Sequence, residues 1–321
     1  MKKGVLSKYY TPEGKFSFKI LVKKNWVAWT YCIPVVLGIL IFTIMPVVTS
    51  LVYAFHDYDP TIPADLGSQL SNAGFQHFIK IFTWGKGGLL SEVLWSLFIT
   101  FRYVIISLTL QIVGSYCVAL FLNQQTKGIQ AFRIVYYLPN LIPAVAGTLL
   151  WKEMMATDGY FNIILESVGL PAFDFYRNKA TAMPTLIFTG VFSWGGTAVM
   201  WLAQMQNVPK EMYESANLDG ANYFHKTFKI TIPMTTSMLF YIVVTSIIGG
   251  IQSFSNVYPL LELSEEFRFI VVMIYQYAFE PDVRNSLSMA CALSWVLFVI
   301  IAILTATIFK TSKWVYYGEE V

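Results

Sequence analysis

Charged residues are scarce in this 321-residue sequence. Asp, Glu, Lys and Arg make up 13% of it, whereas soluble domains contain about 25%. Hydrophobic residues account for 56% and aromatic residues for 17%. This composition excludes a nucleic-acid-binding protein, a disordered scaffold and an ordinary cytosolic enzyme. It indicates a protein whose solvent is mostly lipid.

Cysteine is rare as well, because the sequence has only Cys32, Cys117 and Cys291. Each lies inside an apolar stretch without C-x-x-C spacing and without a neighbouring histidine. Neither a disulfide nor a zinc site is therefore expected. We predict that all three are small, buried hydrophobic side chains.

Motifs for catalysis and nucleotide binding are absent from the sequence. It contains no G-x-x-x-x-G-K-[ST] phosphate loop, no H-E-x-x-H and no G-x-S-x-G. All 19 acidic residues fall outside the long apolar runs, which disfavours an ion-driven carrier but leaves open sodium sites made of carbonyl groups. We expect no enzymatic activity, metal site or cofactor in this chain, so its energy source must lie elsewhere.

Long apolar runs, in contrast, are abundant. A hydrocarbon core of about 30 Å needs about 20 apolar residues in a helix. Six runs of about that length are Trp26–Val52, Phe98–Leu122, Ile134–Trp151, Pro184–Gln206, Thr235–Tyr258 and Leu287–Phe309. Arg102 is the only formal charge inside them, and we interpret it as an interfacial residue. The sequence therefore predicts an all-α membrane protein with six transmembrane helices.

A shorter apolar stretch, Phe267–Phe279, has only 13 residues and contains Arg268. It cannot cross the membrane and is expected to be interfacial or re-entrant. The first long run is preceded by 25 residues and is too long for a cleavable signal peptide, so we expect it to remain as a helix.

The distribution of Lys and Arg predicts the orientation, because these residues are retained on the cytoplasmic side. With six spans both termini share one side, and that side holds 14 of the 22 basic residues. We therefore predict a cytoplasmic N-terminal segment 1–25, a transmembrane domain 26–309 with a cytoplasmic loop 207–234, and a cytoplasmic tail 310–321.

Helix-breaking residues occur inside several of these runs. They are Pro34, Pro46, Pro139, Pro143, Gly195-Gly196 and Gly249-Gly250. In lipid, a freed backbone group needs a partner, so such breaks persist only next to protein or a water-filled cavity. Each break alone indicates a packing kink. Together they suggest a pathway whose helices bend or move.

The loop 207–234 has the pattern of two short helices. Pro209 and Glu211 are typical of a helix start, and Asp219-Gly220 is typical of a turn. Phe224, Phe228 and Ile230 then give a second apolar stripe. A pair of helices with an apolar face needs a partner surface.

Residues at fixed spacing in this loop resemble a known family. Glu214-Ser215-Ala216, Asp219-Gly220-Ala221 and Ile230-x-Ile232-Pro233 are similar to the E-A-A…G…I-x-L-P signature of permease subunits of binding-protein-dependent ABC importers. Ser215 and Ile232 are small departures from that pattern.

Weaker motifs resemble the sugar-transporting branch of the family. They are Tyr137-Leu138-Pro139 with Trp151, Asp158-Gly159 with Asn162 and Leu165, and Ile274-Tyr275 with Ala278-Phe279. The resemblance implies a MetI-like fold in the bacterial cytoplasmic membrane. It implies as partners a second permease, two ATPase subunits that bind ATP and Mg²⁺, and an extracytoplasmic sugar-binding protein.

The resemblance also assigns a coupling helix that sits in a groove of the ATPase. The residues expected to make this contact are Glu211, Glu214, Ser215, Ala216, Asp219, Gly220, Ala221 and Phe224. The alternative interpretation of the same residues is an ordinary surface hairpin.

Aromatic rings and amides inside the breakable spans are candidates for sugar binding, since sugars are held by ring faces and directed hydrogen bonds. The candidates are Trp194, Trp201, Tyr241, Gln252, Ser253, Asn256 and Tyr258. Gln252 and Asn256 lead because a four-residue spacing places both on one face of a helix.

The function predicted from the sequence is that of an importer permease for an oligosaccharide or related glycan, working by alternating access. Alternatives in the same superfamily are permeases for glycerol phosphates or polyamines. Alternatives of another class are an ATP-independent channel and a secondary carrier.

Overall fold

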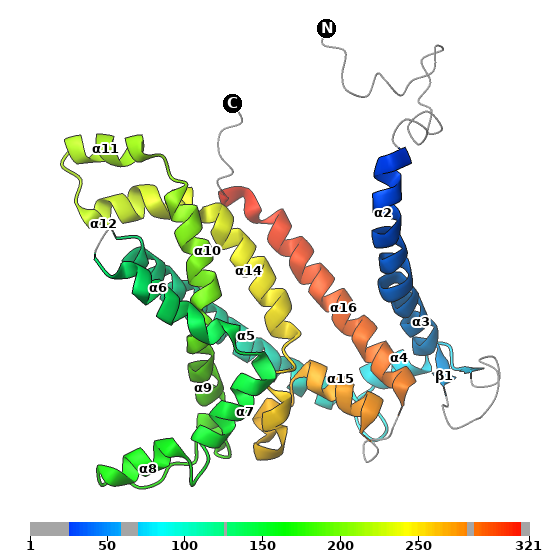
Figure 1. Cartoon of the computed structure of the whole chain (residues 1–321). Helices are drawn as coiled ribbons and strands as arrows, with labels where there is room; N and C mark the ends of the chain where they lie inside the picture. Colours follow the sequence, from blue (N-terminus) through cyan, green and yellow to red (C-terminus); the bar gives the residue numbers. More distant parts are fainter. Residues whose placement is uncertain (1–25, 59–69, 125–126, 281–285, 316–321) are drawn as a thin grey trace, which may run out of the picture.

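A computed structural model describes residues 26–58, 70–124, 127–280 and 286–315. Apart from one two-stranded hairpin, the described chain is helical (Figure 1). The predicted N-terminal segment 1–25 and the last six residues of the predicted tail lie outside this part of the chain.

The first predicted span is a long rod whose first half stands apart from the other helices (Figure 1). It consists of α2 (Trp26–Ile39), a π-helical turn η2 (Leu40–Ile44) and α3 (Met45–Ala54). Pro46 follows the π-helical turn within a helix that is continuous from Thr30 to Ala54, so one backbone hydrogen bond of this helix is missing at Pro46. The rod contacts α16 through α3.

A small outer subdomain follows the rod. β1 (His56–Tyr58) pairs antiparallel with β2 (Leu70–Asn72), and α4 (Gln76–Phe82) comes next. The backbone amide of Tyr58 donates to Ser288 Oγ at 2.9 Å. This bond ties the hairpin to the start of the last long helix.

The longest helix is α5 (Leu90–Leu122), whose 33 residues span about 50 Å. It begins eight residues before the predicted Phe98, because Val93 and Ser96 in its first turns are buried against other elements. It contacts α4, α6, α9, α10, α14 and α15. It is therefore the central element of the fold.

Three further predicted spans are helix pairs bent at a short break. The third is α6 (Ile129–Tyr137) with a 3-10 turn η3 (Leu138–Leu141), followed by α7 (Ala144–Met154) at 94°. The fourth is α9 (Lys179–Gly190) with η4 (Val191–Ser193), followed by α10 (Gly195–Gln206) at 48°.

The fifth span is the bent pair that joins the loop 207–234 to α14. The segments α12 (Tyr223–Lys226), η5 (Thr227–Thr231) and α13 (Ile232–Met234) meet α14 (Thr236–Ile251) at 61°. The helix ends at Ile251 and not near the predicted Tyr258, because the chain turns there into an irregular segment.

The remaining elements lie mostly at the end of the molecule opposite α11 (Figure 1). They are α8 (Tyr160–Ser167), the 3-10 turns η6 (Tyr258–Leu263) and η7 (Glu265–Phe267), and α15 (Ile270–Phe279). From this end α16 (Leu287–Lys310) runs back across the molecule to a last turn, η8 (Ser312–Trp314). The ten-residue α15 is the apolar segment that the sequence predicts to be too short to cross.

The outer loop around α8 is held by one buried amide. Asn162 donates from Nδ2 to the carbonyls of Ala156 (2.9 Å) and Phe173 (3.0 Å), and its Oδ1 accepts the amide of Phe173 at 2.7 Å. Asn162, which belongs to the Asp158-Gly159 motif of the sequence, thus holds the two ends of this loop together.

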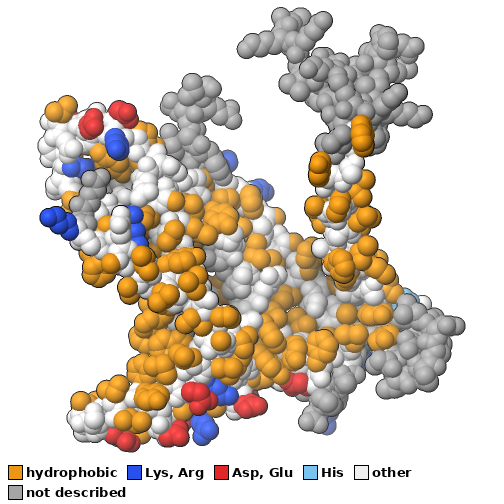
Figure 2. All heavy atoms as spheres, in the orientation of Figure 1, with side chains coloured by type: hydrophobic (Ala, Val, Ile, Leu, Met, Phe, Trp, Pro, Cys, Tyr) orange, Lys and Arg blue, Asp and Glu red, His pale blue; other side chains and the backbone are white. Residues whose placement is uncertain are grey.

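Hydrophobic side chains cover the middle of the molecule, and charged ones gather at its two ends (Figure 2). Within the part of the chain that the structure describes, three helices are long and apolar enough to cross a membrane alone, and three bent pairs raise the number of candidate crossings to six. Cys291 is buried as predicted, but Cys32 and Cys117 are exposed on the helix surface, so the prediction for these two is wrong. Tyr31 and Ile33 beside Cys32 are exposed as well, because a membrane helix can turn its apolar side chains toward lipid.

Candidate functional site

The breaks of the third and fourth spans lie against each other. A Cβ added at Gly195 would lie 2.7 Å from the carbonyl oxygen of Tyr136, and one added at Gly196 would lie 3.0 Å from Nδ2 of Asn140. Only glycine therefore allows the start of α10 to approach the end of α6 this closely. This contact explains Gly195, whereas at position 196 the neighbouring atom belongs to a side chain that can shift.

A cavity of about 260 Å³ lies beside this junction, between α5, the α9–α10 break and the end of α14. Trp194 forms one wall and packs directly on Gly114 of α5, where an added Cβ would lie 2.1 Å from the indole ring. The polar lining residues include Gln111, Ser246 and Ser253. Gln111 Nε2 also donates to Thr197 Oγ1 at 2.9 Å, which joins α5 to α10.

A second cavity of about 500 Å³ adjoins the first and is lined mainly by the third and fourth spans. Tyr103, Gly190, Ser193 and Asn256 line both cavities. The second cavity adds aromatic and polar side chains, which include Trp151, Tyr176, Asn140 and Thr189.

Tyr176 belongs to the outer loop that precedes α9. Burial raises its pKa to about 12, so the phenol stays neutral and able to donate a hydrogen bond at any physiological pH. The two cavities together offer ring faces and neutral hydrogen-bonding groups. Their described lining contains no lysine or arginine.

Of the seven predicted pathway residues, Trp194, Ser253 and Asn256 line these cavities. Trp201 does not, because it is buried in the core, with its indole donating to Ser115 Oγ at 3.2 Å. Tyr241 is 51% exposed on the surface of α14.

The predicted helical face shared by Gln252 and Asn256 does not exist, because α14 ends at Ile251. Gln252 is the C-terminal cap of the helix and lines neither described cavity, whereas Asn256 lies in the irregular segment and lines both. Tyr258 stacks on Phe254 at 4.9 Å and donates to Glu280 at 3.4 Å. It thus belongs to the outer loop.

Sequence reasoning missed Tyr103, Gln111 and Asn140 as lining residues. Gln111 is a polar residue in the middle of an apolar run, and Asn140 follows a helix-breaking proline, so both had a detectable signal. Tyr103 had none, since an aromatic ring beside Arg102 is also typical of a membrane interface.

The loop 207–234 forms a helical hairpin, which Figure 1 shows at one end of the molecule. Its first helix, α11 (Lys210–Leu218), has Glu211 in its first turn, where a carboxylate favours the helix dipole. The helix ends in a Schellman motif: the amide of Ala221 donates to the carbonyl of Ala216, and that of Gly220 to the carbonyl of Asn217. Gly220 has φ +73°, which explains the glycine.

The predicted coupling residues come together on this hairpin. Described residues of α11 are exposed or half-buried and none is buried, although large apolar side chains are present. Leu218 is 91% exposed and Phe224 is 69% exposed. Glu211, Glu214, Ser215, Asp219 and Gly220 are exposed, whereas Ala216 and Ala221 are half-buried beneath the turn.

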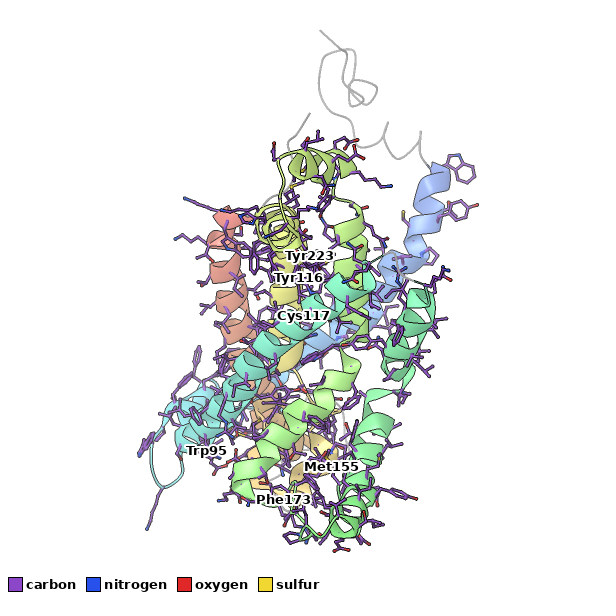
Figure 3. All side chains as sticks on the ribbon, turned by 90° about the vertical axis from the view of Figure 1, so that its left-hand side faces the viewer. Trp95, Tyr116, Cys117, Met155, Phe173 and Tyr223 are labelled. Carbon is purple, nitrogen blue, oxygen red and sulfur yellow. The ribbon has the colours of Figure 1, made fainter. Side chains whose placement is uncertain are left out.

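A line of hydrogen bonds joins this hairpin to the helix bundle. The hydroxyl of Tyr213 lies 2.9 Å from Thr231 Oγ1, and the hydroxyl of Thr235 donates to the carbonyl of Thr231 at 2.9 Å. Thr235 Oγ1 is also 3.5 Å from the hydroxyl of Tyr116, whose ring packs edge-on against Trp201. Figure 3 shows Tyr116 on α5 close to Tyr223 of the hairpin, and Met155 and Phe173 at the other end.

Two ion pairs lie toward the opposite end of α5. Arg102 pairs with Glu266, which is buried, and Arg268 Nη2 lies 3.2 Å from Glu92 Oε2. Thr100 Oγ1 accepts the amide of Ile270 at 3.0 Å. Arg102, predicted as a residue that reaches lipid headgroups, thus has a counter-charge within the protein.

No protein-family model matches the chain. The probable ABC transporter permease protein YesP of Bacillus subtilis strain 168 is 31% identical over 304 residues, which are 93% of this chain and 94% of that protein. The arabinooligosaccharides transport system permease protein AraP of the same strain is 24% identical over 297 residues, 91% of this chain and 90% of that protein.

A similar fold occurs in a bacterial ABC transporter involved in the import of the acidic polysaccharide alginate. The TM-score is 0.76 at 20% identity, over 91% of this chain and 96% of that chain. The apolar helices indicate an integral membrane protein, and the relationship to YesP covers nearly the full length of both proteins. This chain therefore belongs to the permease subunits of carbohydrate-type ABC importers.

Proposed function

We propose that this chain forms half of the translocation pathway of an importer for an oligosaccharide or related glycan. In this proposal it crosses the bacterial cytoplasmic membrane six times, with both termini in the cytoplasm. The three long helices and three bent pairs support six crossings, and the excess of basic residues on the hairpin side supports the orientation.

The two adjoining cavities are the proposed sugar pathway. Trp194, Trp151 and Tyr176 supply ring faces, and Asn256 and Gln111 supply amide hydrogen bonds. The absence of Lys and Arg from their described lining disfavours a phosphate ester, which needs a cationic partner. Related permeases named for arabinooligosaccharides, lactose and trehalose/maltose support a glycan.

The hairpin is the proposed contact with a separate ATPase. Its exposed apolar residues Leu218 and Phe224, with the acidic Glu211 and Glu214 nearby, form a surface that the described chain leaves open. The ATPase subunits would bind ATP and Mg²⁺ and hydrolyse the nucleotide. Moving a two-state transporter from 1:99 to 99:1 takes about 5.5 kcal/mol, so many hairpin contacts must act together.

A second permease and an extracytoplasmic binding protein complete the proposed assembly. The rod formed by α2, η2 and α3 is an argument for a second permease. Its most apolar stretch, within Thr30–Ala54, is 0% buried by the described chain and is free to contact another subunit. A bacterial alginate ABC transporter of similar fold forms a complex with a periplasmic protein that carries an alginate pentasaccharide. That complex supports a binding protein as a partner of this chain.

The observation that carries the proposal is the line of contacts from Tyr213 of the hairpin to Trp201 beside the cavity-forming helices. Sugar uptake by a strain lacking this gene tests it. Complementation with the intact chain should restore accumulation of one glycan class, and ATPase subunits should copurify. Uphill transport by vesicles containing this chain alone would contradict it.

A further inference from the structure

An apolar groove of about 520 Å³ opens on the surface between α5 and α9. Its walls are made by hydrophobic side chains of both helices: Ile106, Leu110, Met183, Pro184, Ile187, Phe188 and Val191. Ile106 and Phe188 are 42% and 49% exposed. The groove is separate from the polar cavities, although Ile187 lines both this groove and the smaller cavity.

Two basic side chains, Arg102 and Lys179, complete the lining of the groove. Arg102 precedes the apolar wall residues along α5, and Lys179 is the first residue of α9 and precedes those of that helix. Both helices lead from the outer loops toward the hairpin end (Figure 1). The two cations therefore lie at the same end of the apolar slot.

The local charges leave this end positive. Arg102 is neutralised by Glu266, but its Nε is buried without a hydrogen-bond partner among the described residues. Lys179 is exposed and forms no ion pair within the described chain. One uncompensated positive charge thus stands at the mouth of an apolar slot.

We propose that this groove binds an anionic phospholipid, with one acyl chain between α5 and α9 and its phosphate at Lys179 and Arg102. A cation at the mouth of an apolar slot can pair with a phosphate while the slot holds an acyl chain. A free phosphate would not use the apolar walls, and an apolar helix of a neighbouring subunit would leave Lys179 without a counter-charge. One lipid charge matches the one uncompensated cation.

Native mass spectrometry of the complete transporter tests the site, with phosphatidylglycerol and phosphatidylcholine of identical acyl chains as probes. We expect one phosphatidylglycerol per copy of this chain to stay bound preferentially. Lys179→Ala should weaken its binding roughly fivefold, the effect of about one basic residue near a membrane surface. Ala180→Phe should block the slot and release the lipid whichever headgroup it has.

The matched control is Lys86→Ala, which removes an exposed lysine at the same end of the molecule but outside the groove. It should leave lipid binding unchanged, and Lys179→Arg should retain it. Equal binding of the two lipids, or equal effects of the two alanine variants, would overturn the proposal. So would a cross-link from Ile106→Cys to a helix of a neighbouring subunit. None of these readouts depends on which sugar is transported.

Discussion

The hydroxyl of Tyr213 lies 2.9 Å from Oγ1 of Thr231, which joins the first helix of the exposed hairpin to the π-helical turn that leads back into the membrane domain. A second side-chain contact between the two segments joins Lys226 to Asn217. The bond of Tyr213 and that of Thr235 to the carbonyl of Thr231 connect α11 to the base of α14.

Tyr213→Phe should weaken this connection, because it removes one hydrogen bond worth about 1 kcal/mol. We expect substrate-stimulated ATP hydrolysis in proteoliposomes to fall by roughly fivefold, while the basal rate stays the same. Tyr223→Phe is the control, since that ring is 52% exposed on the neighbouring helix. Equal behaviour of the two variants would exclude a special role for Tyr213.

Gly220→Ala should impair assembly with the ATPase, because a side chain at φ +73° costs roughly 1–2 kcal/mol. Gly220→Asn should be tolerated better, as asparagine is the next most common residue at this position of a Schellman motif. Copurification of the ATPase subunits measures the effect.

Gly169→Ala provides a matched control for the strain itself. Gly169 has φ +82° and ends α8 at the opposite end of the molecule. The same pair of hydrogen bonds closes that helix: the amide of Gly169 donates to the carbonyl of Glu166, and that of Leu170 to the carbonyl of Leu165. It should lose a similar amount of stability without losing the ATPase. If both variants retain or lose the ATPase alike, the hairpin is not the docking element.

Asn256→Leu should reduce the apparent affinity for the sugar by roughly fivefold, the effect of one lost hydrogen bond. Asn256 lines both cavities, whereas Gln252 lines neither. Gln252→Leu is therefore the control and should leave the KM of uptake unchanged. If Gln252→Leu raised the KM of uptake and Asn256→Leu did not, the sugar pathway would lie on the Gln252 side of this segment and not in the two cavities.

Glu266→Gln should destabilise the assembled protein by about 2 kcal/mol. It removes the counter-charge of Arg102 from a buried position, and partial exposure of Arg102 reduces the cost from that of a fully buried pair. Glu265→Gln, an exposed neighbour, should have no measurable effect. Thermal unfolding of the two variants in the same detergent compares them.

The sequence predicts much of this architecture because lipid imposes simple requirements. Apolar runs must be helical, and Asp219-Gly220 between two short amphipathic segments can only be read as a turn. The exposed hairpin and the breaks at Gly195-Gly196 follow from such local rules.

The end of α14 was not predictable in this way. The sequence beyond Ile251 has no charged residue and no proline before Pro259. Its polar residues Gln252, Ser253 and Asn256 are compatible with a helix that faces a cavity, so they do not by themselves mark the change to irregular structure. Val257 is fully buried, and it is packing against other segments that holds the chain there. The pairing of Arg102 with Glu266 joins residues 164 positions apart, which a local pattern does not reveal.

The right-angled elbow between η3 and α7 has a consequence for how this segment can cross a bilayer. Its arms of 13 and 11 residues reach about 20 Å and 16 Å, so neither covers a hydrocarbon core of about 30 Å. Leu141 and Ile142 at the bend are 64% and 50% exposed. The segment can therefore cross only as a bent unit, and its elbow must lie inside the hydrocarbon region with its unpaired backbone groups turned toward protein or water.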